Sequence, residues 1–126
     1  MQEVLFMSRW DMKKNIPHIT NKYAVISVND TEQELHEIKD LLSEACEVLS
    51  LVVKDDDEDF NDAHAEEIKK FVNANSEKSI LVHCFAGISR SAAIARWAEY
   101  ELFGELSPRM KNYSVYNKHV YDVLSK

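Results

Sequence analysis

The sequence predicts an α/β protein with a mainly parallel central sheet and helices on both faces of that sheet. Short apolar segments alternate along the chain with longer amphipathic ones, which is the order expected of strands and crossover helices. Ile80, Leu81 and Val82 are apolar in succession, as in strands that are buried on both faces. The 126 residues suffice for one sizeable core, so we expect a single domain over residues 1–126.

The predicted strands are four short segments, at residues 4–7, 23–28, 48–53 and 80–83. Residues 8–20 are expected to form an irregular connection. Thr31 followed by Glu34 forms a capping box, which predicts the start of a helix after the second strand. Further helices are expected at residues 61–74, from residue 91 onward, and at about 114–124, with Val115 and Val120 buried in the last one.

The composition restricts the class of protein. Apolar residues make up 45% of the chain and charged residues 29%, as in ordinary globular proteins. The net charge of −7 disfavours nucleic acid and anionic membranes as partners. No apolar run approaches the length of a membrane span, and the N-terminus lacks the pattern of a signal peptide. Two cysteines argue against a disulfide framework and favour a cytoplasmic location. We also expect a monomer.

The stretch from residue 80 to residue 91 carries the chemistry. A buried strand leads into a short loop that holds Cys84 and Arg90, and Ser91 then begins an apolar helix. A loop before a helix N-terminus is suited to binding anions, because its N–H groups and the helix dipole both favour negative charge. The same surroundings favour the thiolate of Cys84, and the Arg90 guanidinium matches two phosphate oxygens.

The rest of the loop is expected to contact the bound oxyanion through its backbone. Gly87 lies where a left-handed backbone or a close approach is needed. Ser89 and Ser91 flank the helix start, where one can cap the helix and the other can donate a hydrogen bond to the thiolate. The residues expected to bind substrate are Phe85, Ala86, Gly87, Ile88, Ser89 and Arg90.

The run His83-Cys84-Phe85-Ala86-Gly87-Ile88-Ser89-Arg90-Ser91 resembles the His-Cys-x-x-Gly-x-x-Arg-Ser signature of the cysteine-dependent protein tyrosine phosphatases. Its wording is most similar to the dual-specificity branch, and the resemblance covers mainly residues 48–104. It implies that Cys84 attacks phosphorus to form a phosphocysteine, that Arg90 holds the phosphate, and that Ser91 assists release of the thiolate. It also implies a fold like that of these phosphatases.

An acidic run after the third strand is the predicted source of the general acid. Parallel strands end at one edge of the sheet, so this run and the Cys84 loop are expected to converge. Phosphoester cleavage needs a proton for the leaving oxygen and later a base for water, and one carboxyl group can serve both steps. The resemblance favours Asp55, with Asp56 and Asp57 left open. The alternative is a solvated loop in which Asp59 or Asp62 caps the next helix.

The loop also bears on the substrate. Related lipid phosphatases carry lysines in this loop, whereas the five residues between Cys84 and Arg90 are uncharged here. This favours phosphotyrosine or phosphoserine/threonine on a protein or peptide over a lipid or nucleotide substrate. The other readings are a weak or inactive phosphopeptide-binding module, a lipid or nucleotide phosphatase on the same fold, and a sulfur-transfer enzyme of the rhodanese type.

The remaining reactive side chains receive structural roles. His83 is expected to orient the loop by hydrogen bonds, and Cys46 to pack in the core. Trp10 is expected to pack in the interior, with a place beside the substrate as the alternative. The other histidines lack the spacing of metal ligands, so we expect no metal and no cofactor.

Overall fold

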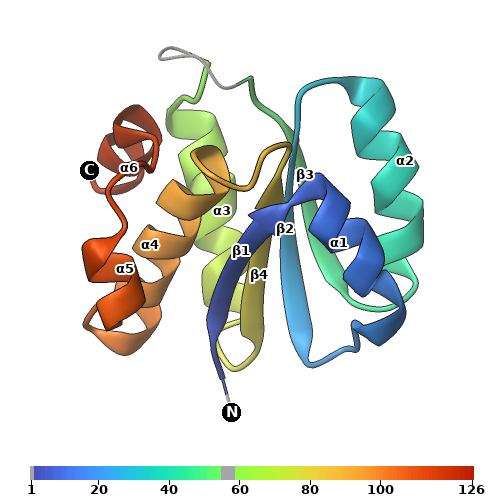
Figure 1. The fold of residues 1–126 in the computed structure, drawn as a ribbon, viewed down its shortest axis with the longest axis horizontal. Helices are drawn as coiled ribbons and strands as arrows, with labels where there is room; N and C mark the ends of the chain where they lie inside the picture. The colour runs from blue at the N-terminus through green and yellow to red at the C-terminus, as the bar shows by residue number, and fades with distance from the viewer. Residues whose placement is uncertain (1, 55–58) are drawn as a thin grey trace.

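The computed structural model describes residues 2–54 and 59–126 (Figure 1). Its centre is a sheet of four strands in the order β1-β4-β2-β3, and every neighbouring pair is parallel. The predicted α/β class with a parallel sheet is therefore confirmed. The strands span β1 (Val4–Ser8), β2 (Tyr23–Asn29), β3 (Glu47–Val52) and β4 (Ser79–Cys84).

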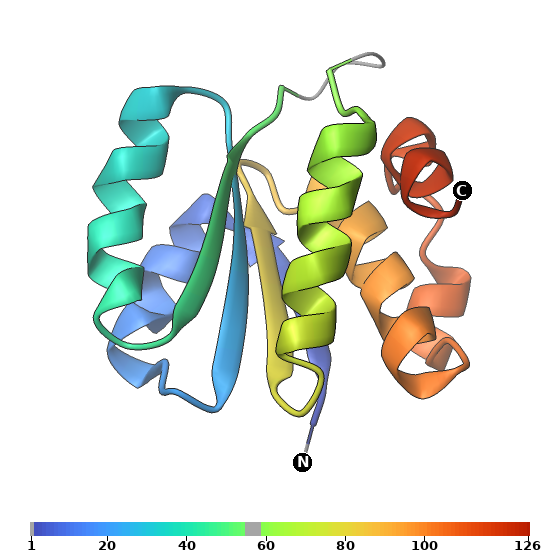
Figure 2. The same cartoon turned by 180° about the vertical axis from the view of Figure 1, so that it is seen from behind.

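Helices cover both faces of the sheet, as Figures 1 and 2 show from opposite sides. Helices α1 and α2 pack on one face, and α3 and α4 pack on the other, with α6 against them. The helices span α1 (Arg9–Asn15), α2 (Glu32–Ser43), α3 (Asp62–Ala74), α4 (Arg90–Phe103), α5 (Pro108–Asn112) and α6 (Lys118–Leu124). In the described part of the chain, no helix has the length and apolar character needed to cross a membrane.

The sheet separates two apolar cores. On β4, Ile80 and Val82 face the α3–α4 side, while Leu81 faces the α1–α2 side. Successive residues of a strand point to opposite faces, so a strand buried on both faces is apolar at consecutive positions. The α3–α4 core also contains Ile26, Ile68, Val72, Ile94 and Leu124, and the α1–α2 core contains Met12, Val25, Ile38 and Leu42.

The N-terminal connection differs from the prediction, because residues 9–15 form helix α1. The Ser8 side chain caps this helix by accepting a hydrogen bond from the Asp11 N–H at 3.0 Å. Asp11 lies in the first turn and Lys13 and Lys14 lie in the last, which suits the helix dipole. Trp10 is 68% exposed on α1, so the prediction that it packs in the interior was wrong.

The C-terminal region also differs. Pro108 starts helix α5 after the cap residue Ser107, which is a favourable pair for a helix start. The last helix begins only at Lys118, because the Asn117 side chain accepts from the Val120 N–H and caps it there. Val115 therefore lies before this helix and is exposed, so its predicted burial was wrong, whereas Val120 is buried.

Two predicted caps also differ in detail. Thr31 accepts from the Glu34 N–H as expected, but the Glu34 carboxylate accepts from the Asp30 N–H, one residue before the cap. Helix α3 is capped by Asn61, whose side chain accepts from two N–H groups of the first turn. Asp59 and Asp62 are therefore not its cap.

Candidate active site

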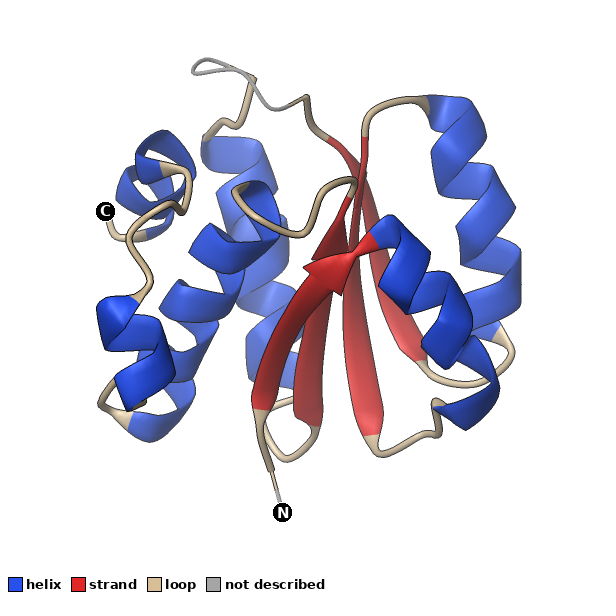
Figure 3. Cartoon of the chain, in the orientation of Figure 1, coloured by secondary structure: helices blue, strands red, loops and turns tan. Residues whose placement is uncertain are grey.

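Cys84 is the last residue of β4, at the carboxyl edge of the sheet. The strands of the sheet lie side by side in red in Figure 3. Strand β4 lies between β1 and β2, so Cys84 is at the end of an inner strand. The residue is 1% exposed. Its Sγ lies 3.2 Å from the Gly87 backbone nitrogen, which donates to it, and 3.2 Å from the Ser91 hydroxyl oxygen. The thiol donates to the Ser91 hydroxyl, and the same hydroxyl can donate to the sulfur once the thiol has lost its proton.

Hydrogen-bond donors from other segments hold the loop after Cys84 by binding to its backbone carbonyls. The Arg9 N–H donates to the Phe85 carbonyl at 3.1 Å. The Tyr113 hydroxyl donates to the Ile88 carbonyl at 2.7 Å, and the Asn117 N–H donates to the Ser89 carbonyl at 3.1 Å. In a trans peptide the next N–H points opposite to the carbonyl. Carbonyls held outward therefore turn the following N–H groups toward the inside of the loop.

Gly87 has a backbone conformation that excludes other residues. Its φ is +73°, in the left-handed region. A Cβ atom at this position would lie 2.3 Å from the Ser8 nitrogen and 2.5 Å from the Met7 carbonyl carbon. The loop thus passes directly against the end of β1, and only glycine fits this approach.

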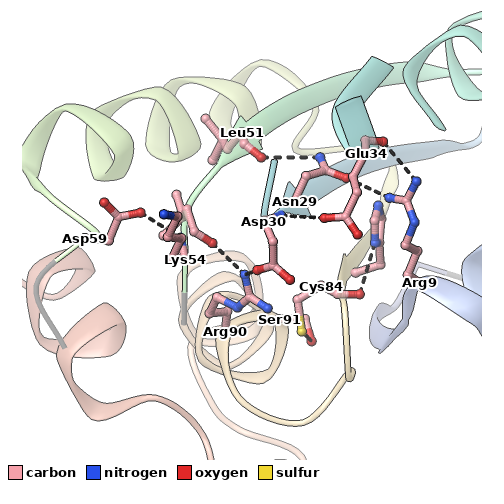
Figure 4. A network of polar contacts seen from close by, with 12 residues as sticks. Arg9, Asn29, Asp30, Glu34, Leu51, Lys54, Asp59, Cys84, Arg90 and Ser91 are labelled. Atoms are coloured by element: carbon pink, nitrogen blue, oxygen red, sulfur yellow. Dashed lines mark hydrogen bonds and ion pairs between the residues drawn. The ribbon is translucent and has the colours of Figure 1, made fainter. Parts of the chain in front are cut away.

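Arg90 is the first residue of α4, and 4% of it is exposed. Its Nη1 atom donates to the Asp30 carboxylate at 2.6 Å and to the Val53 carbonyl at 2.5 Å. Figure 4 shows Asp30 and Arg90 joined in this way, next to Cys84 and Ser91. Nη1 carries two hydrogens, so a bidentate phosphate contact would use the Nε–Nη2 edge of the guanidinium.

The end of β3 meets the Cys84 loop, as the parallel topology predicted. Val53 follows β3 and touches Arg90 through its carbonyl. The next residue, Lys54, donates its N–H to the Asp59 carboxylate at 2.6 Å, as Figure 4 shows. The predicted general acid, Asp55 with Asp56 and Asp57 as alternatives, lies outside the described residues.

His83 is fully buried beneath the loop. Its Nε2 lies 2.6 Å from the Ser27 hydroxyl oxygen on β2, and its Nδ1 lies 3.3 Å from the Cys84 carbonyl oxygen. Burial lowers the pKa of His83 to about 4, and the charges of Arg9 and Arg90 act in the same direction. The imidazole is therefore neutral at pH 7, where it can orient the loop and cannot serve as a cationic proton donor.

No protein-family model matches the chain, and no curated protein matches it. Solved structures do match it. The crystal structure of Tk-PTP in the active form is 19% identical with a TM-score of 0.67, and the match covers 99% of this chain and 90% of that one. The PTP-2 phosphatase of Cydia pomonella is 21% identical with a TM-score of 0.68, over 98% of this chain and 84% of that one.

A third match is the human tyrosine phosphatase-like serine/threonine/tyrosine-interacting protein. It is 20% identical with a TM-score of 0.59, and the match covers 96% of this chain and 88% of that one. The chain has the protein tyrosine phosphatase fold. The prediction from the His83–Ser91 run is thus confirmed at the level of the fold, and it extends well beyond residues 48–104.

Within this phosphatase fold, the predicted loop residues occupy one small region. Cys84, Gly87, Arg90 and Ser91 make the contacts described above. Phe85 and Ile88 are 57% and 51% exposed, so the rim of the loop is apolar. Ser89 is the N-cap residue of α4 but makes no side-chain cap hydrogen bond, so that expected role was wrong. Its carbonyl instead accepts from Ala93 and Asn117.

Four further residues position this loop and were not predicted from the sequence. Asp30 follows β2 at the same edge as Cys84, and the edge rule for parallel sheets could have indicated it. Arg9 follows β1 at that edge and is buried, which is unusual for arginine. Tyr113 and Asn117 reach the loop from the α5–α6 connection, and only the tertiary packing brings them there.

Proposed function

We propose that this protein is a cysteine-dependent phosphatase that hydrolyses phosphomonoesters through a phosphocysteine on Cys84. One observation carries the proposal. The Cys84 sulfur lies at the floor of a loop whose carbonyls are held outward, within 3.2 Å of a backbone N–H donor and of the Ser91 hydroxyl, with the Arg90 guanidinium at the end of the same loop. This arrangement suits a nucleophile placed under a tetrahedral oxyanion.

The first step is attack of the Cys84 thiolate on phosphorus. The S–P bond forms while the P–O bond to the leaving group breaks, and a general acid supplies a proton to the leaving oxygen. Loop N–H groups and the Arg90 guanidinium stabilise the phosphoryl oxygens. The second step is attack of water on the phosphocysteine. The carboxylate left by the general acid takes a proton from the water while the S–P bond breaks. The Ser91 hydroxyl, which lies 3.2 Å from Sγ, donates a hydrogen bond to the departing thiolate.

We assign the general acid to the run Asp55 to Asp57, with Asp55 preferred. The contact between the Val53 carbonyl and Arg90 supports this assignment, because it brings the start of the acidic segment to the phosphate-binding arginine. The bond between Lys54 and Asp59 brings the two ends of the segment together. Asp30 is a poorer candidate, because its carboxylate already accepts from the Arg90 guanidinium at 2.6 Å.

The proposed substrate is a phosphorylated protein or peptide. Arg90 is the one charged residue among positions 85–90, and a substrate with several phosphates would need more cations there. The exposed Phe85 and Ile88 side chains offer apolar contact to the group that carries the phosphate. This favours an aromatic phosphoester such as phosphotyrosine, with phosphoserine/threonine as the alternative.

The test is hydrolysis of para-nitrophenyl phosphate under reducing conditions from pH 5 to pH 8. Wild type is compared with Cys84→Ser and with the matched control Cys46→Ser, because Cys46 is the other free thiol. We expect Cys84→Ser to abolish turnover and Cys46→Ser to retain it. Among Asp55→Asn, Asp56→Asn and Asp57→Asn, the variant that loses the high-pH limb of the profile identifies the acid.

Three outcomes would contradict the proposal or a part of it. Turnover that survives in Cys84→Ser would show that the thiol is not the nucleophile. A folded wild-type protein that binds vanadate but turns over neither aryl phosphate nor phosphotyrosine peptide would favour the phosphopeptide-binding module. Faster turnover of phosphoinositide vesicles than of phosphopeptides would move the substrate class to lipids.

A further inference from the structure

Arg9 is a buried arginine that lies outside the Cys84 loop and contacts it through its backbone N–H. It is 8% exposed, at the start of α1. Its Nη2 donates to the Glu34 carbonyl at 3.0 Å and to the Glu37 carboxylate at 3.1 Å, both on α2. Its Nη1 points inward and donates to the Asn29 side-chain oxygen at 3.0 Å, a contact that bracing α1 on α2 does not require (Figure 4).

The inward contact fixes the orientation of the Asn29 amide. A guanidinium has only donors, so the Asn29 group that faces it must be the oxygen. The Asn29 nitrogen therefore faces the other way, where it donates to the Ser27 hydroxyl oxygen at 3.1 Å. It also donates to the carbonyls of Ser27 and Leu51 on β2 and β3.

The same direction of hydrogen-bond donation continues from Asn29 to the backbone of Cys84. Because the Ser27 oxygen accepts from Asn29, its own hydrogen is available for His83 Nε2 at 2.6 Å. At the other end, the Cys84 carbonyl can only accept, so His83 Nδ1 carries the proton. The Cys84 end requires this tautomer, and the Ser27 hydroxyl, which can donate as well as accept, is compatible with it. Every donor in the chain points the same way, from the guanidinium to the backbone of Cys84.

We propose that Arg9 is a positioning residue, which sets the direction of a hydrogen-bond chain that ends on the backbone carbonyl of Cys84. The guanidinium is always protonated, so the chain cannot reverse. The Arg9 N–H also holds the Phe85 carbonyl directly. Two successive carbonyls are thereby turned away from the interior of the loop, and the N–H groups that follow them are turned inward. The catalytic part of this inference rests on the proposed function.

Three titratable or charged groups surround His83. Among the described residues they are the charged side chains of Arg9 from α1 and Arg90 from α4, and the thiol of Cys84, which follows His83 at the end of β4. The low pKa of His83 keeps the ring neutral at pH 7, so its tautomer is defined under ordinary conditions. The tautomer is therefore a readout of the chain that does not depend on activity.

The experiment measures the His83 tautomer and the kinetic constants together. Nitrogen NMR of protein labelled at histidine, at pH 7, distinguishes the protonated from the bare ring nitrogen, and His83→Gln assigns the signals. In wild type we expect protonated Nδ1 and bare Nε2. In Arg9→Met we expect a mixture of tautomers and a kcat that is lower by about ten- to a hundredfold, with a smaller change in KM. Arg9→Lys keeps a charged donor and is expected to restore most of both.

A double-mutant cycle separates positioning from bracing. Ser27→Ala interrupts the chain and leaves the bonds of Arg9 intact, so it also serves if Arg9→Met does not fold. We expect Ser27→Ala to lose the fixed tautomer, and Arg9→Met to have little further effect on kcat in that background. Arg96→Gln is the matched control, because that guanidinium donates to the Met110 carbonyl and lies over Tyr116. It is expected to lower stability while leaving the His83 tautomer unchanged.

Two results would overturn the inference. One is an unchanged tautomer in Arg9→Met or Ser27→Ala. The other is a double variant whose loss of kcat equals the product of the two single losses, which would make Arg9 a structural brace alone. If wild type shows no turnover but its His83 tautomer still changes in Arg9→Met, the proposed function is overturned and the positioning role of Arg9 is not.

Discussion

Arg90 and Asp30 form an ion pair of 2.6 Å at the carboxyl edge of the sheet, although they lie sixty positions apart in the sequence. The Arg90 side chain is buried, and the Asp30 side chain is partly exposed. The pair fixes one nitrogen of the guanidinium and thereby fixes the plane of the fork. A carboxylate at this position would by itself oppose binding of an anion, so we infer that Asp30 serves to align the Arg90 guanidinium.

We therefore expect Asp30→Asn to lower kcat/KM by about tenfold, the equivalent of one charge-assisted hydrogen bond. The measurement is steady-state hydrolysis of an aryl phosphate, with vanadate affinity determined alongside. Asp40→Asn on the exposed surface of α2 is the control and is expected to be neutral. An increase in vanadate affinity and in kcat/KM would show that Asp30 competes with the phosphate for Arg90.

We expect one added methyl group at Gly87 to have a strong effect on anion binding and on stability. Gly87→Ala places a Cβ 2.3 Å from the Ser8 nitrogen and also strains a positive φ, so the loop cannot keep its conformation. We expect loss of vanadate binding and a decrease in the free energy of unfolding of at least about 2 kcal/mol. Gly104→Ala is the comparison, because it has a similar φ in open space and is expected to cost about 1 kcal/mol without loss of vanadate binding.

Tyr113 predicts a smaller effect on the same loop. Partial burial, and then the neighbouring Cys84, raise the pKa of its hydroxyl, which keeps the proton that it donates to the Ile88 carbonyl. We expect Tyr113→Phe to lower kcat several-fold and stability by about 1 kcal/mol, since the ring contact with Phe6 is retained. Thermal unfolding and kinetics of this variant, beside Tyr116→Phe, measure both. Equal effects of the two variants would argue against a specific role of Tyr113.

Burial of His83 is expected to make the free energy of unfolding depend on pH in the acidic range. Its pKa is about 4 in the folded protein and about 6.5 when unfolded, so between these values the unfolded chain binds the extra proton. The free energy of unfolding therefore decreases as the pH falls from about 6.5 to about 4, by up to about 3 kcal/mol. Urea unfolding at pH 7, 6, 5 and 4.5 tests this. The decrease is expected to shrink in His83→Gln and to persist in His36→Gln, which changes an exposed histidine.

Much of the fold could be predicted from the sequence, because local pattern and burial agree in the central elements. Strand β4 is apolar at consecutive positions and is paired on both sides. Near the two ends of the chain, the helix boundaries depend on single capping residues and not on apolar periodicity. Helix α1 depends on the Ser8 cap and on charges in its turns, whereas its apolar periodicity is short, and the start of α6 is set by one Asn117 cap.

The candidate site could be proposed from the sequence where its residues are contiguous, but not where they come from distant segments. The residues from Cys84 to Ser91 follow one another, so their spacing was informative. Arg9, Asp30 and Tyr113 come from three other segments, and their contacts with the loop depend on the strand order β1-β4-β2 and on the docking of the α5–α6 connection. The general acid stays a prediction, since Asp55, Asp56 and Asp57 lie outside the described residues.

The most direct test of the account is detection of a phosphoryl group on Cys84. Wild-type protein is mixed with an aryl phosphate, the reaction is stopped by rapid denaturation, and the digested peptide that contains Cys84 is weighed by mass spectrometry. We predict one added phosphoryl group on that peptide, localised to the Cys84 sulfur and absent from Cys84→Ser. Turnover of the aryl phosphate with an unmodified Cys84 peptide, or with the phosphoryl group on another residue, would contradict the account.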